Sequence, residues 1–503
     1  MLYNLNAQIA NTYSAEVPNK YFDFTLKLTK ETPGFTPPVA SRAFGYTGLA
    51  LYEAIVNGMP NNISFVNKLP QFQSVTPISS GAVYHWPTVA NNVLAVIIDS
   101  LWANASQANK AILHAYKNSY NVIFQSQVSA SVYADSKLYG ENIANDIFLY
   151  SKNDGGHQGY NSNFPTSYVP PVGAGLWVPL TGQLALQPQW GNNRPFVLDN
   201  MVSTIPGPPP AFSTSPGSAF YNYANDVYLQ STNNTPGQVI IAQYWADGGG
   251  TFSPPGHSMA MLKNILIFEN ASLETATLQY AKMGMALADA FRACWKTKYL
   301  YNCIRPIGYI NDNIDSNWVP LVQTPPFPEY SSGHSSQSGA MEAIMEDYLG
   351  TSYSFIDSAH GSNFGGPRSF NSFNEAAEEA AISRLYGGIH YEFGNEIGLT
   401  TGRGVGANIN ALFDQVTLSL EEAIAEQTSI KLYPNPAEND LKIMVSGIEN
   451  YSIEIYNLMG QSMNFESGNL NTFDVSNLSP GMYNVKVISS DQTKLITKNF
   501  VKK

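Results

Sequence analysis

The spacing of apolar residues changes once along this chain, and that change constrains its fold more than any other feature. Up to about residue 425 the apolar residues recur at helical spacing, as in SRAFGYTGLALYEAIVNGM, WPTVANNVLAVIIDSLW and TATLQYAKMGMALADAFRACWKTKYLYNCI. From about residue 430 they alternate with polar residues, as in SIEIY, YNVKVIS and KLITKNFV, with turns such as NLSPG between them. The sequence therefore predicts an all-α helical bundle over residues 1–426 and a small β-sandwich over residues 427–503.

Composition limits the class of protein and the partners it takes. Of 503 residues, 44% are hydrophobic and 13% are charged, which is typical of a globular chain long enough for a large core and a second domain. The net charge of -12 argues against nucleic acid or an anionic membrane surface as the main partner. Apolar runs fall short of the roughly 18–20 residues that span a bilayer. The opening stretch MLYNLNAQIANTYSAEV lacks the basic and apolar regions of a secretory signal, so we expect that signal to have been removed or to lie upstream.

A long stretch rich in Gly, Pro and Asn occupies residues 154–217 and includes NDGGHQGYNSNFP and IPGPPPAFSTSPGS. A loop of this length within a compact domain usually covers something or is disordered. The aromatic residues Trp177, Trp190 and Phe196 favour a packed cover.

Cysteine and histidine spacings match no zinc or redox motif, because the sequence has no CxxC pair and no HExxH cluster. The two cysteines, Cys294 and Cys303, lie nine residues apart in a predicted helix. Nine residues span about 13 Å at 1.5 Å per residue, which is too far for a disulfide unless the helix breaks. We therefore expect buried free thiols.

The segment FPEYSSGHSSQSGA, residues 327–340, carries the first candidate site residues. It leads into MEAIMEDY, whose apolar residues have helical spacing, so Ser332, Gly333 and His334 fall near a helix N-terminus. Free backbone N–H groups and the helix dipole favour an anion there. The glycine permits close backbone approach, while the serine and histidine add a hydroxyl and a titratable ring. Taken alone, the tripeptide is weak evidence for a site, because a loop that caps a helix accounts for it better.

Two further segments contribute cations and a second histidine. In KTKYLYNCIRP, Lys298 and Arg305 are seven residues apart, which predicts both on one face of a helix that Pro306 ends. In SRLYGGIH, Arg384 and His390 are six residues apart, and the two glycines between them permit a break that brings both side chains to one site.

The three segments together supply a receptor for a tetrahedral or trigonal-bipyramidal oxyanion: two guanidiniums, one ammonium, a hydroxyl, a helix-start N–H and two imidazoles. Each residue also has a plain structural alternative. Arg305 fits a surface cation at a helix end, and Arg384 fits an ion pair with Glu378 or Glu379. His390 fits a hydrogen-bonded residue of the core.

In chain order the pattern is K-x6-RP … SGH … SR-x5-H, and with it the chain resembles the vanadium-dependent haloperoxidases and the related acid phosphatases of the PAP2 superfamily. The flanking stretches FRACWKTKY, PPFPEYSSGHS and AISRLYGGIHYEF are similar too, as are PPVASRAFGYTGLALYEA and YWADGGGTFSPPGH upstream. The resemblance covers most of residues 35–415 and is greatest to the bacterial branch that includes iodoperoxidases. It implies a helical fold with vanadate as the cofactor.

The resemblance implies a role for each matching position. His390 would bond vanadium axially, and His334 at the opposite apex would act as acid and base. Trp295 and Phe327 would line the halide pocket, together with Tyr244 or Trp245. The vanadate oxygens would be held and neutralised by Lys298, Arg305, Ser332, the Gly333 N–H and Arg384. Hydrogen peroxide would then oxidise halide to a hypohalous acid equivalent while the metal keeps its oxidation state, with iodide the expected halide and bromide the alternative.

One position departs from the family pattern, which continues as H-x3-D after the ligand histidine. Here HYEFGN places Gly394 where the aspartate belongs. In the family that carboxylate orients the histidine through a hydrogen bond. We expect Glu392, Asn395 or a backbone carbonyl to substitute for it.

The C-terminal segment carries a second resemblance. LYPNPAENDLKI, IEIYNLMGQ, LSPGMYNVKV and the closing KNFVKK are similar to the C-terminal sorting domain of Bacteroidetes type IX secretion. The resemblance implies export through the periplasm and across the outer membrane, with the secretion machinery as partner and a secreted or cell-surface location. The alternative is a carbohydrate-binding or adhesive β-sandwich.

Three functions are therefore open from the sequence. The first is a secreted haloperoxidase that uses vanadate, hydrogen peroxide and halide. The second is an acid phosphatase with His390 as nucleophile and His334 as general acid. The third is a non-catalytic oxyanion-binding surface protein.

Overall fold

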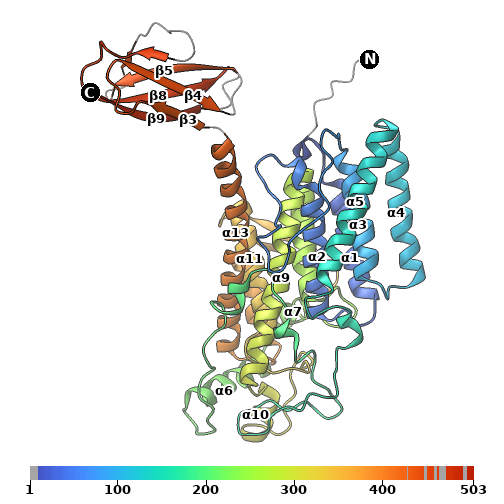
Figure 1. Ribbon diagram of the computed structural model, residues 1–503. Helices are drawn as coiled ribbons and strands as arrows, with labels where there is room; N and C mark the ends of the chain where they lie inside the picture. Colours follow the sequence, from blue (N-terminus) through green and yellow to red (C-terminus); the bar gives the residue numbers. More distant parts are fainter. Residues whose placement is uncertain (1–8, 428, 447–449, 458–460, 464–471, 491–494) are drawn as a thin grey trace. The chain divides into compact units, whose positions relative to one another are not determined.

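The computed structural model describes residues 9–427, 429–446, 450–457, 461–463, 472–490 and 495–503. The chain divides into two units, Met1–Asp414 and Gln415–Lys503. The first is helical and the second consists mainly of strands (Figure 1), which confirms the predicted fold class. The division falls inside the last helix, α13 (Glu392–Gln427), so the domain boundary at residue 426 stays a prediction.

Two helices near the middle of the helical unit, α2 and α9, pack side by side (Figure 1) and are buried on nearly every face. A helix that is apolar nearly all round is stable only inside a core, which explains why α2 has just two charged residues, Arg42 and Glu53. Buried charges on α9 are paired, as Asp289 is with Arg292. Three helices that we did not predict, α1, α6 and α10, also belong to this unit. Besides α13, the helices are α1 (Glu16–Glu31), α2 (Pro37–Ile55), α3 (Trp86–Leu101), α4 (Gln107–Gln125), α5 (Ala130–Ser151), α6 (Ala219–Thr232), α7 (Pro236–Tyr244), α8 (Ser253–Phe268), α9 (Leu273–Tyr301), α10 (Pro306–Asn313), α11 (Gly333–Leu349) and α12 (Phe373–Tyr386).

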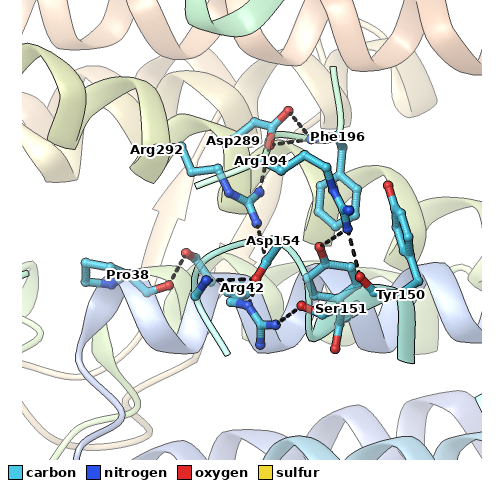
Figure 2. A network of polar contacts seen from close by, with 12 residues as sticks. Pro38, Arg42, Tyr150, Ser151, Asp154, Arg194, Phe196, Asp289 and Arg292 are labelled. Atoms are coloured by element: carbon cyan, nitrogen blue, oxygen red, sulfur yellow. Dashed lines mark hydrogen bonds and ion pairs between the residues drawn. The ribbon is translucent and has the colours of Figure 1, made fainter. Parts of the chain in front are cut away.

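A buried ion network fastens the long stretch 154–217 to the helices (Figure 2). Asp154 accepts from Arg42 Nε of α2 at 2.8 Å and from Arg292 Nη2 of α9 at 3.3 Å. Arg292 Nη1 also donates to Asp289 at 2.8 Å, and that carboxylate accepts the backbone N–H of Phe196. Since Trp177, Trp190 and Phe196 are all buried, the prediction of a packed cover is confirmed.

Glycines bring α11 and α13 unusually close, and this approach positions the start of α11. A Cβ atom added at Gly402 would lie 2.0 Å from the Ser336 carbonyl oxygen, and one at Gly398 would lie 2.8 Å from the Ser332 carbonyl oxygen. Larger residues would push the two helices apart. The glycines of α13 therefore hold the SGH segment against the helix that follows His390.

The sheets are small, and each is antiparallel. A short hairpin of β1 (Phe355–Asp357) and β2 (Arg368–Phe370) lies within the helical unit and was not predicted. In the second unit the sheets have the orders β3-β4-β7 and β6-β5-β8-β9, and their apolar side chains, among them Leu441 and Val485, form one buried cluster. These strands are β3 (Ser429–Tyr433), β4 (Asp440–Ser446), β5 (Tyr451–Asn457), β6 (Ser462–Met463), β7 (Thr472–Asp474), β8 (Gly481–Ser489) and β9 (Leu495–Lys502).

Among the helices of the described residues, none has both the length and the apolar content that crossing a bilayer requires.

Candidate active site

A cavity of about 590 Å³ is lined by residues from two of the three predicted segments, the one that carries Gly333 and His334 and the one that carries Arg384 and His390. Its wall also includes the glycine-rich loop Asp247–Gly250, which follows α7. Lys298 and Arg305 lie buried beside it. Of the predicted site residues, those that line the cavity are Trp295, Phe327, Gly333, His334, Arg384 and His390.

Ser332 is the N-cap of α11, as the sequence analysis predicts. Its Oγ accepts from the backbone N–H of Ser335 and lies 3.0 Å from the Ser335 hydroxyl oxygen. Gly333 and His334 occupy the first helical turn, where backbone N–H groups point along the axis. Burial, followed by the charge of Arg384, holds the pKa of His334 well below its ordinary value, so the ring is neutral at pH 7.

The Lys298 ammonium, on the last turn of α9, donates to three backbone carbonyls. Its Nζ lies 2.9 Å from the oxygens of Pro328 and Glu329 and 2.5 Å from that of Ser331. Burial lowers its pKa to about 8. Lys298 therefore fixes the turn that leads into Ser332, besides placing positive charge at the site.

Arg305 is not on the same helix as Lys298, so that part of the sequence analysis is wrong. α9 ends at Tyr301 because Asn302 adopts the left-handed conformation (φ 45°), and Pro306 begins α10 instead of ending α9. Cys303 likewise lies beyond α9, although both cysteines are free and buried as expected. Arg305 Nε donates to the Phe327 carbonyl at 2.9 Å.

Arg384 and His390 come together through the predicted glycine break. α12 ends at Tyr386, and Gly388 takes a positive φ of 76°, with a Cβ there meeting Pro320 and Trp318 at 3.0 Å. Arg384 Nη1 donates to the Trp245 carbonyl at 2.6 Å.

The alternative ion pairs for Arg384 are wrong, because Glu378 pairs with Arg403 and Glu379 with Arg368. Burial lowers the pKa of both Arg305 and Arg384 to about 10, so both remain charged at pH 7.

Glu329 supplies the carboxylate that Gly394 lacks, which corrects the expectation of Glu392, Asn395 or a carbonyl. Its Oε1 lies 2.7 Å from His390 Nδ1. Glu392 is exposed, and the Asn395 side chain accepts from Ser335. The only signal in the sequence was the position of Glu329, three residues before Ser332.

The aromatic residues differ in their distance from the cavity. Trp295 and Phe327 line it, with ring centroids 4.9 Å apart, and the Lys298 ammonium lies 5.0 Å from the Phe327 centroid. Tyr244 is fully buried behind the wall, where its hydroxyl donates to the Asp357 carbonyl at 3.2 Å. Trp245 contributes its backbone carbonyl to Arg384.

A buried acid–imidazole cluster stands behind His334, and the sequence analysis missed it. Asp247, His257 and His360 place ligand-type atoms within 4.8 Å of one another. His257 lies between two carboxylates, 3.1 Å from Asp247 and 2.7 Å from Asp357, and these charges raise its pKa to about 10 against the effect of burial. Asp247 also lies 4.0 Å from His334 Nε2. Asp247 and Asp357 lie 10 and 100 residues from His257 along the chain, so no short sequence motif contains the cluster.

The donor set of the site fits an oxyanion bound at His390. Because Nδ1 of His390 donates to Glu329, the lone pair is on Nε2, the arrangement that a metal-binding histidine needs. Within the described part of the chain, three buried nitrogen atoms near it have no hydrogen-bond partner: Arg305 Nη2, Arg384 Nε and His334 Nε2. Unpaired buried donors are costly, and an anion would satisfy them.

Comparisons with known proteins agree with this class of site. Residues 279–417 match the family model of the VCPO second helical-bundle domain, and residues 431–503 match that of the secretion system C-terminal sorting domain. A vanadium chloroperoxidase from Curvularia inaequalis is 24% identical over 375 residues, 62% of this chain; the chain spans 61% of that relative's length.

Solved structures match a larger share of the chain. The crystal structure titled as the first bacterial vanadium-dependent iodoperoxidase superposes with a TM-score of 0.71 at 30% identity, over 80% of this chain and 96% of that one. An apo bacterial vanadium-dependent chloroperoxidase shares the fold, with a TM-score of 0.60 at 16% identity over 77% of this chain and 95% of that one. Fold and site thus define a helical oxyanion-binding protein. The chain belongs to the vanadium-dependent haloperoxidase family, and it carries a type IX sorting domain that directs it to the cell surface or the exterior.

Proposed function

We propose that this protein is a vanadate-dependent haloperoxidase that oxidises halide with hydrogen peroxide, and that iodide is its preferred halide. The observation that carries the proposal is the state of His390, whose Nε2 keeps its lone pair among three buried cations, Lys298, Arg305 and Arg384, two of which keep unpaired donors. The choice of iodide is supported by the iodoperoxidase relative at 30% identity.

Each site residue has a role that its surroundings support. His390 would bind the metal, while Ser332, the Gly333 N–H and the three cations would hold and neutralise the oxyanion. His334, neutral and unpaired at Nε2, would take and return the proton of the peroxide. Trp295 and Phe327 would form the apolar wall that halide meets. Bound vanadate would supply the Lewis acidity that makes peroxide electrophilic.

The acid phosphatase alternative gains from one observation. Glu329 gives His390 the carboxylate partner that a nucleophilic histidine also needs, so glycine at position 394 does not argue against hydrolysis. In the third alternative, a non-catalytic surface protein, the site would bind oxyanions but would catalyse neither halide oxidation nor phosphate-ester hydrolysis.

Triiodide formation by the purified protein, with hydrogen peroxide and iodide, tests the proposal. We expect activity only after orthovanadate is added, and loss of it in His390→Ala. His334→Ala should keep vanadate binding within about tenfold but lower turnover by about 10²–10⁴. Hydrolysis of p-nitrophenyl phosphate that vanadate inhibits, without triiodide, would favour the phosphatase. Bromide in place of iodide measures the halide preference.

We further infer that the type IX machinery recognises the C-terminal unit during export. Removing residues 431–503, the segment that matches the sorting-domain family, should leave the helical unit in the periplasm. Immunoblots of the medium, cell surface and periplasm would measure this, and unchanged export would contradict it.

A further inference from the structure

We propose that Glu329 and Gly394 are an exchanged pair: Glu329 supplies the carboxylate that orients His390, and position 394 is glycine because that carboxylate fills the space of a side chain there. This proposal rests on the proposed function for the role of His390 as metal ligand. It makes Glu329 a positioning residue, which acts on the cofactor through His390.

The hydrogen bonds of Glu329 fix one tautomer of His390. Oε1 of Glu329 accepts from His390 Nδ1 at 2.7 Å and from the backbone N–H of Tyr391 at 3.2 Å. All of these groups are buried, so water does not compete for them. Because the proton is on Nδ1, Nε2 is left with its lone pair, and it accepts from Arg305 Nη1 at 3.1 Å.

The space around Gly394 explains the glycine. A Cβ added there would lie 2.3 Å from Glu329 Oε1 and 3.0 Å from Oε2. Gly394 belongs to α13, where its backbone needs no special conformation, so steric exclusion and not flexibility accounts for it. A side chain at position 394 and the observed position of the Glu329 carboxylate exclude each other.

Main-chain contacts hold Glu329 in this position. Its backbone N–H donates to the Cys303 carbonyl at 3.0 Å, and its carbonyl accepts from Lys298. The Ser332 N–H donates to the Gly394 carbonyl at 2.9 Å, which joins the two segments directly. A side chain at position 394 would therefore have to displace the carboxylate alone, and that displacement would break its hydrogen bonds from His390 Nδ1 and the Tyr391 N–H.

The test is a double-mutant cycle of Glu329→Ala, Gly394→Asp and Glu329→Ala/Gly394→Asp, with Glu329→Gln and Glu392→Gln alongside. Vanadate binding to the apo-protein is measured by calorimetry, and the melting temperature (Tm) is measured without vanadate. Outer-shell carboxylates contribute about 10–100-fold to metal affinity, so Glu329→Ala should weaken vanadate binding by that factor. Glu329→Gln keeps an acceptor for Nδ1 and should lose less than about tenfold. Exposed Glu392 is the matched control and should change neither quantity.

Gly394→Asp alone should lower both Tm and vanadate affinity, because two carboxylates compete for one space. The double variant should recover Tm and bind vanadate more tightly than either single variant, since the introduced carboxylate then faces His390 alone. The proposal of an exchanged pair would be overturned if Glu329→Ala bound vanadate as tightly as wild type. It would also be overturned if the double variant had no higher Tm or vanadate affinity than the single variants. If wild-type protein fails to bind vanadate, the proposed function fails, while recovery of Tm in the double variant still tests the pair separately.

Discussion

Arg305 Nη1 donates a hydrogen bond to Nε2 of His390 across 3.1 Å. The nitrogen atom that we propose as the metal ligand is therefore bonded to a guanidinium that we propose to neutralise the vanadate oxygens. The same guanidinium donates to the Ile389 carbonyl at 2.7 Å and keeps Nη2 unpaired. An oxyanion bound at Nε2 would replace the hydrogen bond from Arg305 Nη1, and its oxygens would accept from the unpaired Nη2 of the same side chain. The site is therefore preorganised: without a bound oxyanion, the lone pair of His390 Nε2 accepts a hydrogen bond from Arg305.

Arg305→Lys should weaken vanadate binding by about 10–100-fold, because hydrogen bonds to charged groups contribute about 1.5–3 kcal/mol and lysine lacks the planar fork. Calorimetry on the apo-protein measures this. Arg403→Lys is the control, since Arg403 pairs with Glu342 and Glu378 away from the cavity lining. Equal affinities in wild type and Arg305→Lys would contradict the role of the guanidinium.

Lys298→Met should destabilise the folded protein by about 2 kcal/mol or more, because it leaves the buried carbonyls of Pro328 and Glu329 unpaired at roughly 1–3 kcal/mol each. The Ser331 carbonyl would keep only the Cys294 thiol as a donor. Urea unfolding of the helical unit is the measurement. Lys296→Met is the matched control: Lys296 lies on the same helix but donates to a single carbonyl, that of Met201. A loss no larger than that of Lys296→Met would show that Lys298 does not hold the turn.

Glu53 is buried, and burial raises its pKa to about 7. The folded state therefore keeps this proton while the unfolded state loses it near its ordinary value, so stability falls as pH rises between about 4.5 and 7. In Glu53→Gln the amide oxygen can still accept from the Phe65 N–H, and the amide NH₂ can still form a hydrogen bond with Ser64 Oγ. The Tm of Glu53→Gln should exceed that of wild type, and the difference should grow as pH rises across this range. At the upper end it should correspond to at most about 3 kcal/mol of unfolding free energy. Parallel curves of Tm against pH would refute this.

His257 should make the folded state sensitive to alkali. Asp247 and Asp357 raise its pKa to about 10, above the value near 6.5 in the unfolded chain. Its contribution to stability is complete below pH 6.5 and is lost as pH rises towards 10. His257→Gln should melt well below wild type at pH 6, with the difference narrowing by pH 10. A difference that stays constant over this range would mean that the imidazole is not charged in the folded protein.

The sequence by itself determined the two-part fold, because a period of 3.6 or 2 records which face of each element is buried. It also determined the order of the three motifs, and with them the identities of the clustered residues. Local signals were enough where the chemistry is local: Ser332 caps α11, and the Gly387–Gly388 break turns Arg384 and His390 into one site. Arg305 was misplaced because a single left-handed residue, Asn302, ends α9 earlier than the apolar pattern does.

Only the tertiary structure decided which groups complete the site. The partner of His390 is Glu329, 61 residues away in sequence, and Asp357 reaches His257 across 100 residues. Both pairs involve buried polar groups, and such groups take whatever partner the packing brings near, since leaving them unpaired is costly. Glycine at position 394 was visible in the sequence as a missing carboxylate. That it makes room for another carboxylate follows from the approach of two segments that no local pattern connects.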